Sequence, residues 1–355
     1  MHEIAVEERA HKIPVAILGA TGSVGQRMVE MLSRHPWFEI VQVAASDRSV
    51  GKRYREAVTW LLSTPIPEKI RSMEITDATK PSDARIVFSA LDAYVAEEIE
   101  QHWANQGVSV VTNARPHREH PEVPLIIPEV NAENLGLLHY QKFAHGGIIV
   151  ANPNCVSIGL SLALAPLVQE FKVDKVSVST YQSASGAGFP GIPSLSLLDN
   201  LIPFISGEEE KLEKEPLKVF ARLDENYLHP ASMAISASCV RVPIIEGHLK
   251  SVSVNLQKSV SLEEIKAAFV NYSSPISKMG LPTAPHWPIY FFEEIDAPQP
   301  RFHRFLENGM SIAVGGLRSC SLFDYKFFVL SHNLIRGAAG GSILIAELLV
   351  KQKWV

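Results

Sequence analysis

Short apolar runs alternate with helical patterns in the first part of the chain. The runs that fit buried strands are 14–18, 39–45, 86–88, 108–112, 124–130 and 148–150. After the first run, Val24, Met28 and Leu32 fall on one face of a helix. Strands that alternate with helices predict a Rossmann-type, doubly wound parallel sheet.

The pattern changes after residue 168. Residues 176–180 and 252–256 alternate between apolar and polar positions, and 310–314 and 326–330 add further strands. An apolar helix at 343–350 has no strand of its own, so we expect it to return to the first sheet.

These patterns together predict an α/β protein of two domains. We assign residues 1–154 and 333–355 to a nucleotide-binding domain, and 155–332 to an α+β catalytic and dimerisation domain with a mixed sheet. One face of that mixed sheet has no obvious covering helix, so we predict that it packs against a twofold partner.

Composition excludes several classes of protein. The 355 residues are 46% hydrophobic and 20% charged, with a net charge of −5, which argues against a nucleic-acid binder. Three cysteines without close spacing suggest neither a disulfide framework nor a metal site, and they fit a reducing, cytoplasmic setting. No apolar run reaches the ~18–20 residues of a membrane span. Residues 1–12 resemble a loose charged arm rather than a signal peptide.

A glycine-rich turn, Gly19-Ala20-Thr21-Gly22-Ser23-Val24-Gly25, lies between the first strand and the first helix. Glycines let the backbone approach a pyrophosphate, which the helix N-terminus faces, so the turn predicts a dinucleotide site. The second strand is followed by Ser46-Asp47-Arg48-Ser49. An arginine between hydroxyls suits the 2′-phosphate of NADP, whereas Asp47 keeps NAD open.

Cys155 is the main candidate nucleophile. It follows the turn Ala151-Asn152-Pro153-Asn154 and precedes an apolar helix pattern at 158–168. A thiol at a helix N-terminus sits in positive potential, so we expect a lowered pKa and a reactive thiolate. The alternative is a buried, inert cysteine; the Asn-Pro-Asn turn favours the reactive one.

Three residues are candidate partners of the thiol. His248 is an acid/base candidate because imidazole titrates near neutral pH. Arg241 lies in an apolar segment and needs a partner, either a substrate carboxylate or a structural carboxylate. Gln182 could orient the thiol or be a satisfied loop amide. The charged run 208–215 has the pattern of a solvated helix face.

Taken together, these residues resemble the aspartate-β-semialdehyde dehydrogenase family over nearly the whole chain. The motifs are Gly19–Gly25, Asn152-Pro153-Asn154-Cys155, Gln182–Gly188 and Arg241-Val242-Pro243 followed by Gly247-His248. The regions around Arg48 and 113–118 are more similar to the archaeal and fungal branch. The resemblance implies NADPH-dependent reductive dephosphorylation of L-aspartyl-4-phosphate to the semialdehyde, a step of aspartate-family amino-acid biosynthesis. It also implies a homodimer or homotetramer.

The resemblance also implies residue roles. Cys155 would form a thioester, His248 would be the acid/base, and Gln182 would orient the reacting groups. The implied substrate-binding residues are Arg241 for the carboxylate, Glu208 for the ammonium, and Lys211, Arg118 and Asn154 for phosphate. A second pair, Glu215 and Lys218, could replace Glu208 and Lys211. The expected cofactor-binding residues are Gly19, Thr21, Gly22, Ser23, Val24, Gly25, Ser46, Arg48, Ser49, Ser89, Ala90, Ser185, Gly186, Asn333 and Gly337.

One other enzyme remains open on the same architecture. A malonyl-CoA or acyl-CoA reductase would keep Cys155 and His248 but would have no need of an ammonium-binding glutamate.

Overall fold

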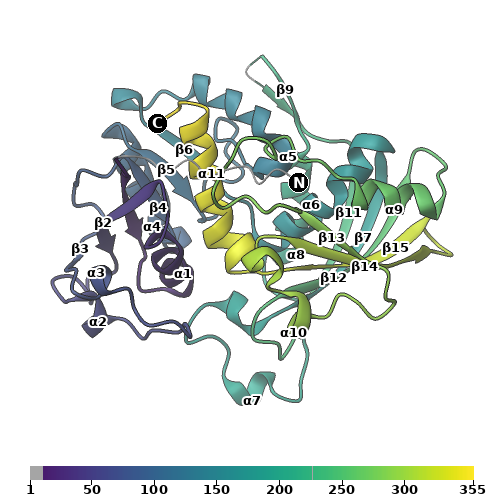
Figure 1. The fold of residues 1–355 in the computed structure, drawn as a ribbon, viewed down its shortest axis with the longest axis horizontal. Helices are drawn as coiled ribbons and strands as arrows, with labels where there is room; N and C mark the ends of the chain where they lie inside the picture. The colour runs from purple at the N-terminus through teal and green to yellow at the C-terminus, as the bar shows by residue number, and fades with distance from the viewer. Residues whose placement is uncertain (1–10, 226) are drawn as a thin grey trace.

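The computed structural model describes residues 11–225 and 227–355, so most of the predicted N-terminal arm lies outside the described residues. The first sheet has six strands, and every neighbouring pair is parallel (Figure 1). Their order is β3 (Ile75–Thr76), β2 (Phe38–Ala44), β1 (Ile13–Leu18), β4 (Ile86–Ser89), β5 (Ser109–Thr112) and β6 (Ile148–Ala151). The predicted doubly wound parallel sheet is confirmed.

Helices α1 (Ser23–Leu32) and α4 (Ala93–Asn105) alternate with these strands, together with the short helices α2 (Tyr54–Ala57) and α3 (Glu68–Arg71). The buried face of α1 carries Met28, Val29 and Leu32, as its 3.6-residue period predicts.

The run 124–130 was expected to complete the sheet, and that expectation is wrong for most of its length. Only Leu125 bridges to β6, and α5 (Pro128–Asn131) follows, continued by a 3-10 segment, η1 (Ala132–Tyr140). Pro128 suits a first helical turn. The Asn131 side chain accepts from Ile127 N and donates to Leu125 O, which bends the chain away from the sheet.

The second sheet has seven strands and is mixed, as predicted. Its order is β13 (Ile289–Phe292), β14 (Ile312–Ser319), β15 (Tyr325–Ser331), β12 (His248–Leu256), β7 (Val173–Gln182), β11 (Ala234–Arg241) and β8 (Ile202–Pro203). A separate hairpin joins β9 (Arg222–Asp224) to β10 (Tyr227–His229). The pattern missed β11 because its small alanine and serine residues give little hydrophobic contrast.

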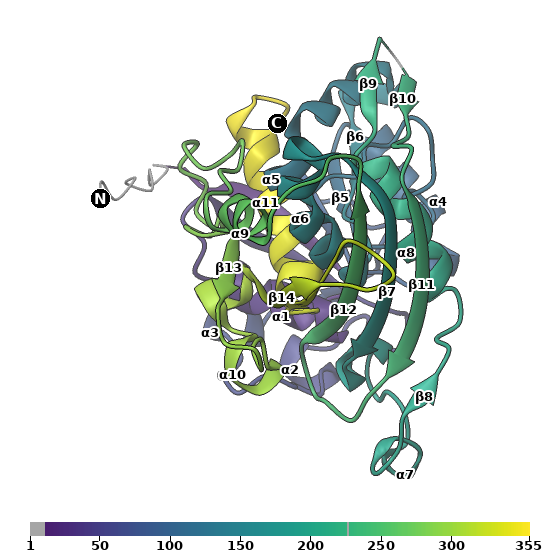
Figure 2. The ribbon, with the colours of Figure 1, turned by 90° about the vertical axis from the view of Figure 1, so that its right-hand side faces the viewer.

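Three helices cover one face of this sheet: α6 (Cys155–Glu170), α8 (Glu208–Val219) and α9 (Leu262–Val270). Figure 2 shows β7, β11 and β12 from the opposite side, with no helix over them. That open face carries half-buried serines, including Ser177, Ser179 and Ser251. The remaining short segments are η2 (Ala144–Gly146), η3 (Ala184–Ala187), α7 (Ser194–Leu197), α10 (Pro300–His303) and η4 (Leu306–Gly309).

The last helix, α11 (Gly340–Lys351), follows a π-helical segment, η5 (Ile335–Ala339), and lies between the two sheets in Figure 1. It packs against α1, β4 and β5, so the chain does return to the first sheet. Its apolar residues 343–346 are completely buried, which explains their uniform hydrophobicity. Across the described residues, no helix is long and apolar enough to cross a membrane.

A buried ion pair ties η5 to α5. Arg336 donates to Glu129 over 2.7 Å, and each side chain is 1% exposed. Removing one partner of such a pair leaves an uncompensated buried charge.

We therefore expect Glu129→Ala to lower the free energy of unfolding by roughly 3–5 kcal/mol. As a control, Asp224→Ala breaks the exposed pair with Arg222 and should cost at most ~1 kcal/mol. Urea denaturation of both variants measures the difference. Equal effects would mean that the buried pair does not hold η5 in place.

Candidate active site

A cavity of about 610 Å³ lies over the glycine-rich turn, at the carboxyl ends of the first-sheet strands. Two glycines are needed there for close packing. A Cβ on Gly25 would lie 2.2 Å from Gly19 O, and one on Gly19 (φ +76°) would lie 2.4 Å from Ala90 O. The turn can therefore bring backbone close to a bound pyrophosphate, and the residues fit a dinucleotide.

Eight of the expected cofactor residues line this cavity: Gly19, Thr21, Gly22, Ser23, Val24, Gly25, Ser46 and Ala90. Asp47 and Asp77 line it too, whereas Arg48 and Ser49 are not among its lining residues. Ser89 is fully buried at the end of β4, where its carbonyl accepts from Asn113 N.

The other expected cofactor residues lie beside the cysteine. Asn333 Nδ2 donates to Ser185 Oγ over 2.9 Å. A Cβ on Gly337 would lie 2.6 Å from Cys155 Cβ, and one on Gly186 would lie 2.7 Å from an Arg241 guanidinium nitrogen. Gly186 and Gly337 thus leave open the space between the thiol and its neighbours.

Cys155 is the first residue of α6. The Asn154 side chain caps this helix by accepting from Val156 N over 2.9 Å, and Asn154 N donates to Glu215 Oε2 over 2.6 Å. The prediction of a lowered pKa is wrong for the thiol: burial raises the pKa of Cys155 to about 12, and Glu208 adds to the rise. Three cations oppose it: Arg118, Lys250 and Arg241. Burial is the largest of these contributions, and with Glu208 it outweighs the three cations.

His248 starts β12 and is 0% exposed. Its Nδ1 accepts from Ser183 N over 3.1 Å, so the neutral ring carries its proton on Nε2. Nε2 is buried without a hydrogen-bond partner among the described residues. Burial, with the nearby Lys250 and Arg241 charges, holds the pKa of His248 well below its usual value, so the ring is neutral.

Arg241 and Gln182 end neighbouring strands and face each other in register. Arg241 is 5% exposed and donates to Ser183 O over 2.7 Å. Among the ion pairs of the described residues, none includes Arg241, which removes the structural-carboxylate alternative for this part of the chain. Gln182 donates to Thr180 Oγ1 over 3.3 Å, so its amide is partly satisfied inside the protein.

Both acid–lysine pairs of α8 reach the site. Glu208 accepts from Lys211 over 2.6 Å and from Asn154 Nδ2 over 3.1 Å. Glu215 pairs with Arg118 over 3.2 Å and is 5% exposed. The run 208–215 is therefore not a simple solvated helix face, because one side of it packs on the Cys155 turn.

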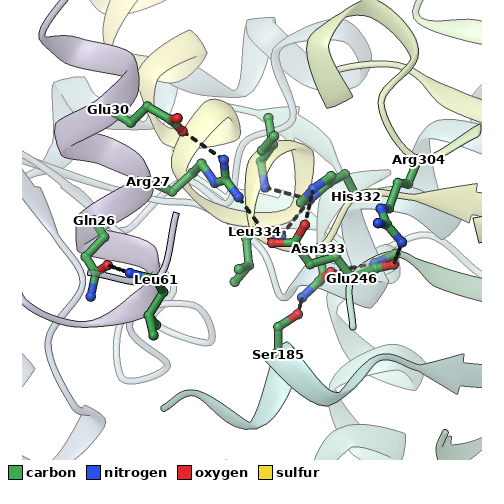
Figure 3. Close-up of polar contacts among 12 residues, drawn as sticks. Gln26, Arg27, Glu30, Leu61, Ser185, Glu246, Arg304, His332, Asn333 and Leu334 are labelled. Carbon is green, nitrogen blue, oxygen red and sulfur yellow. Dashed lines mark hydrogen bonds and ion pairs between the residues drawn. The ribbon is translucent and has the colours of Figure 1, made fainter. Parts of the chain in front are cut away.

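The two domains meet in a polar network that sequence reasoning missed (Figure 3). Arg27 of α1 donates to Glu246 over 3.1 Å, and Glu246 lies 3.3 Å from His332 Nε2. Asn333 Oδ1 accepts from Gly247 N over 2.9 Å. The network thus connects the helix of the glycine-rich turn with the loop before His248. Its only sequence signal was the position of Glu246 two residues before that histidine.

Two family models match this chain, one over the part that holds the glycine-rich turn and one over the part that holds the mixed sheet. Residues 14–137 match the family described as "Semialdehyde dehydrogenase, NAD binding domain", and residues 164–336 match "Semialdehyde dehydrogenase, dimerisation domain". These matches, which cover most of the chain, define a semialdehyde dehydrogenase, an oxidoreductase of small molecules with a dimerisation domain.

Individual relatives narrow the class. The aspartate-semialdehyde dehydrogenase of Archaeoglobus fulgidus is 47% identical over 96% of this chain and 98% of its own, and that of Aspergillus fumigatus is 41% identical over 96% and 97%. The crystal structure of the Candida albicans enzyme with NADP superposes with a TM-score of 0.90 at 36% identity, covering 97% of this chain and 100% of that one. The chain belongs to the aspartate-semialdehyde dehydrogenase family, and these archaeal and fungal relatives confirm the predicted branch.

Glu246 offers a test of the network between the domains. The adjacent His332 ring holds the pKa of Glu246 below its usual value, with help from Arg27 and Arg304 and against burial. A carboxyl with a depressed folded-state pKa stabilises the fold above its unfolded pKa, and that stabilisation is lost as the pH falls through the folded value. Glu246→Gln should therefore lower thermal stability at neutral pH, and the deficit should disappear on acidification.

The matched control is Glu293→Gln, which breaks the exposed pair with Lys266 and should change the melting temperature little. Melting curves across the acid range measure both variants. A deficit that stays constant with pH would show that the Glu246 charge does not stabilise the contact between the domains.

Proposed function

We propose that this chain catalyses the reversible, NADPH-dependent reductive dephosphorylation of L-aspartyl-4-phosphate to L-aspartate-4-semialdehyde. The observation that supports this proposal is that Cys155 interacts electrostatically with Arg241, while Gly186 lies against both Arg241 and His248. The Candida albicans neighbour was solved with NADP, which supports this cofactor over NAD. The reaction belongs to aspartate-family amino-acid biosynthesis.

Cys155 is the proposed nucleophile. Its sulfur attacks the acyl carbon of the substrate, a carbon–sulfur bond forms, and the carbon–oxygen bond to phosphate breaks with its electron pair leaving on phosphate. Bound NADPH would supply the hydride that reduces the thioester carbon. The carbon–sulfur bond would then break, releasing the aldehyde and returning the electron pair to the Cys155 sulfur. Asn154 and Pro153 hold the sulfur at the start of α6, and Gly337 leaves room beside its Cβ.

His248 is the proposed acid/base, and its tautomer decides which ring nitrogen faces the substrate. Because Nδ1 accepts from Ser183, the Nε2–H is the group available to the site. It donates to the substrate oxygen that becomes negative in each tetrahedral step. The neutral ring gives this hydrogen bond without transferring the proton, because the lowered pKa of His248 disfavours only the charged imidazolium form in the buried site.

The substrate charges have complementary partners. Arg241 binds the α-carboxylate and Glu208 the ammonium, while Lys211, Arg118 and Asn154 contact phosphate. We assign the second pair a supporting role: Glu215 fixes Arg118, and Lys218 donates to the carbonyls of Arg118 and His120 over 2.7 Å each. Gln182 orients the reacting groups next to Arg241.

Cofactor contacts are proposed for the residues expected from the sequence, with Arg48 and Ser49 approaching the 2′-phosphate from the exposed turn beside Asp47.

We also propose a division of the chain into two domains: residues 1–154 with 333–355 bind NADP, and residues 155–332 carry catalysis and dimerisation. The open face of the second sheet then packs in a homodimer or homotetramer, and the enzyme is cytoplasmic.

The first test measures NADP reduction with aspartate semialdehyde and phosphate, with NAD in a parallel reaction. We expect phosphate-dependent turnover that favours NADP. Cys155→Ser should abolish turnover while NADP affinity stays within about twofold, because the nucleophile and the cavity use different residues. Oxidation of NADPH by malonyl-CoA, without turnover of the semialdehyde, would favour the acyl-CoA reductase.

A second test separates the two pairs of α8. Glu208→Gln should raise the KM for aspartate semialdehyde by roughly tenfold or more, because an ion pair with the substrate ammonium is lost. Glu215→Gln should instead act through Arg118 and raise the KM for phosphate. Steady-state kinetics with each substrate varied distinguishes them, and the reverse pattern would exchange the two roles.

A further inference from the structure

Lys250 is a buried cation beneath the proposed catalytic centre. It lies on β12 two residues after His248, so both side chains point to the sheet face that α6 covers. The side chain is 0% exposed. Its Nζ donates to Ser331 Oγ over 2.9 Å and, more weakly, to His248 O over 3.4 Å.

The first turns of α6 make room for this ammonium. A Cβ on Gly159 would lie 2.7 Å from Lys250 Nζ and 2.5 Å from Ser331 Oγ, so the glycine permits the approach. Gly159 is four residues after Cys155, and residues four apart lie on the same side of a helix. The ammonium therefore packs against the side of α6 that carries the thiol.

The charge of Lys250 has no carboxylate partner among the described residues, since both of its polar contacts are neutral oxygens. A buried ammonium normally requires an anion. Burial lowers the pKa of Lys250 to about 8, and the groups whose negative forms oppose this are Cys155 and Cys239.

The ionisable groups around Lys250 come from three elements: Cys155 on α6, Cys239 on β11 and His248 on β12. Lys250 lowers the pKa of Cys155, whereas the shift of Cys239 has other causes. Arg118 and Arg241 also favour the thiolate, but they are the proposed substrate ligands, so bound substrate neutralises them. Lys250 is 0% exposed, so its ammonium does not contact the substrate.

We propose that Lys250 is a positioning residue of this enzyme: while protonated, it is a counter-cation that stabilises the Cys155 thiolate from below α6, in the absence and presence of substrate. The importance of Lys250 for turnover rests on the proposed function. The effect of Lys250 on the Cys155 thiol is independent of that function, so the main test uses no substrate.

The test measures alkylation of Cys155 by iodoacetamide against pH in Lys250→Met, with mass spectrometry of the Cys155 peptide to exclude Cys239 and Cys320. Alkylation should be about tenfold slower in Lys250→Met below pH ~8, where the wild-type Lys250 is protonated, and the two profiles should converge as the pH rises above that value. The control Lys266→Met removes a surface ammonium paired with Glu293 and should leave the profile unchanged. An unchanged profile in Lys250→Met overturns the proposal, whatever happens to turnover.

Stability and turnover separate this role from a structural one. Folding lowers the pKa of Lys250 from 10.5 to about 8, so the unfavourable burial of its charge is present in full below that value and is relieved as the pH rises toward 10.5. Lys250→Met should therefore melt higher than wild type at neutral pH while its thiol reacts more slowly. Its kcat/KM should fall by a similar factor below the pKa of Lys250, with recovery at alkaline pH, whereas a structural defect lowers activity at every pH.

If Lys250→Met does not fold, Lys250→Gln takes its place with the same measurements and the same criterion. Wild-type protein that shows the pH-dependent alkylation but no turnover of aspartate semialdehyde would overturn the proposed function and leave the Lys250 result standing.

Discussion

The burial of helix α6 between the two sheets is the constraint on which the rest of the structure depends. Its residues 156–167 are all buried, and the core that surrounds them includes side chains from both sheets. A displacement of α6 would open apolar surface on two sides, at about 25 cal/mol for each Å² exposed. The first residue of this helix is Cys155, so the packing that stabilises both domains also fixes the position of the proposed nucleophile.

The same burial determines the electrostatics of the thiol. Taking a thiolate out of water disfavours it, and this is the largest cause of the raised pKa of Cys155. The surrounding charges then decide how reactive the sulfur can become. Glu208 opposes the thiolate, while Arg118, Lys250 and Arg241 favour it. If Glu208 binds the substrate ammonium as proposed, its charge is neutralised in the complex, and the contribution that raises the pKa of Cys155 is removed.

Two kinds of contact join the domains: hydrogen bonds of Asn333, and ion pairs of Glu246. Asn333 accepts from Gly247 and Ser183, and it donates to Ser185, so one side chain holds three segments of the site together. Glu246 joins Arg27 of α1 to His332 on the other side of the same loop. These contacts connect α1, which follows the glycine-rich turn, with the loop that precedes His248 and β12 (Figure 3).

The sequence by itself determined the features that depend on neighbouring residues: the strand, glycine turn and helix at 14–32, the turn before Cys155, and the apolar helix at the C-terminus. Backbone conformation and burial leave short-range patterns that can be read directly. Only the tertiary structure decided the sign of the thiol pKa shift, the inward side of the 208–215 helix and the identity of Glu246 and Lys250 as partners. These depend on polar and charged groups brought together from distant positions, such as Asn154 and Glu208, which are 54 residues apart, and no local pattern records them.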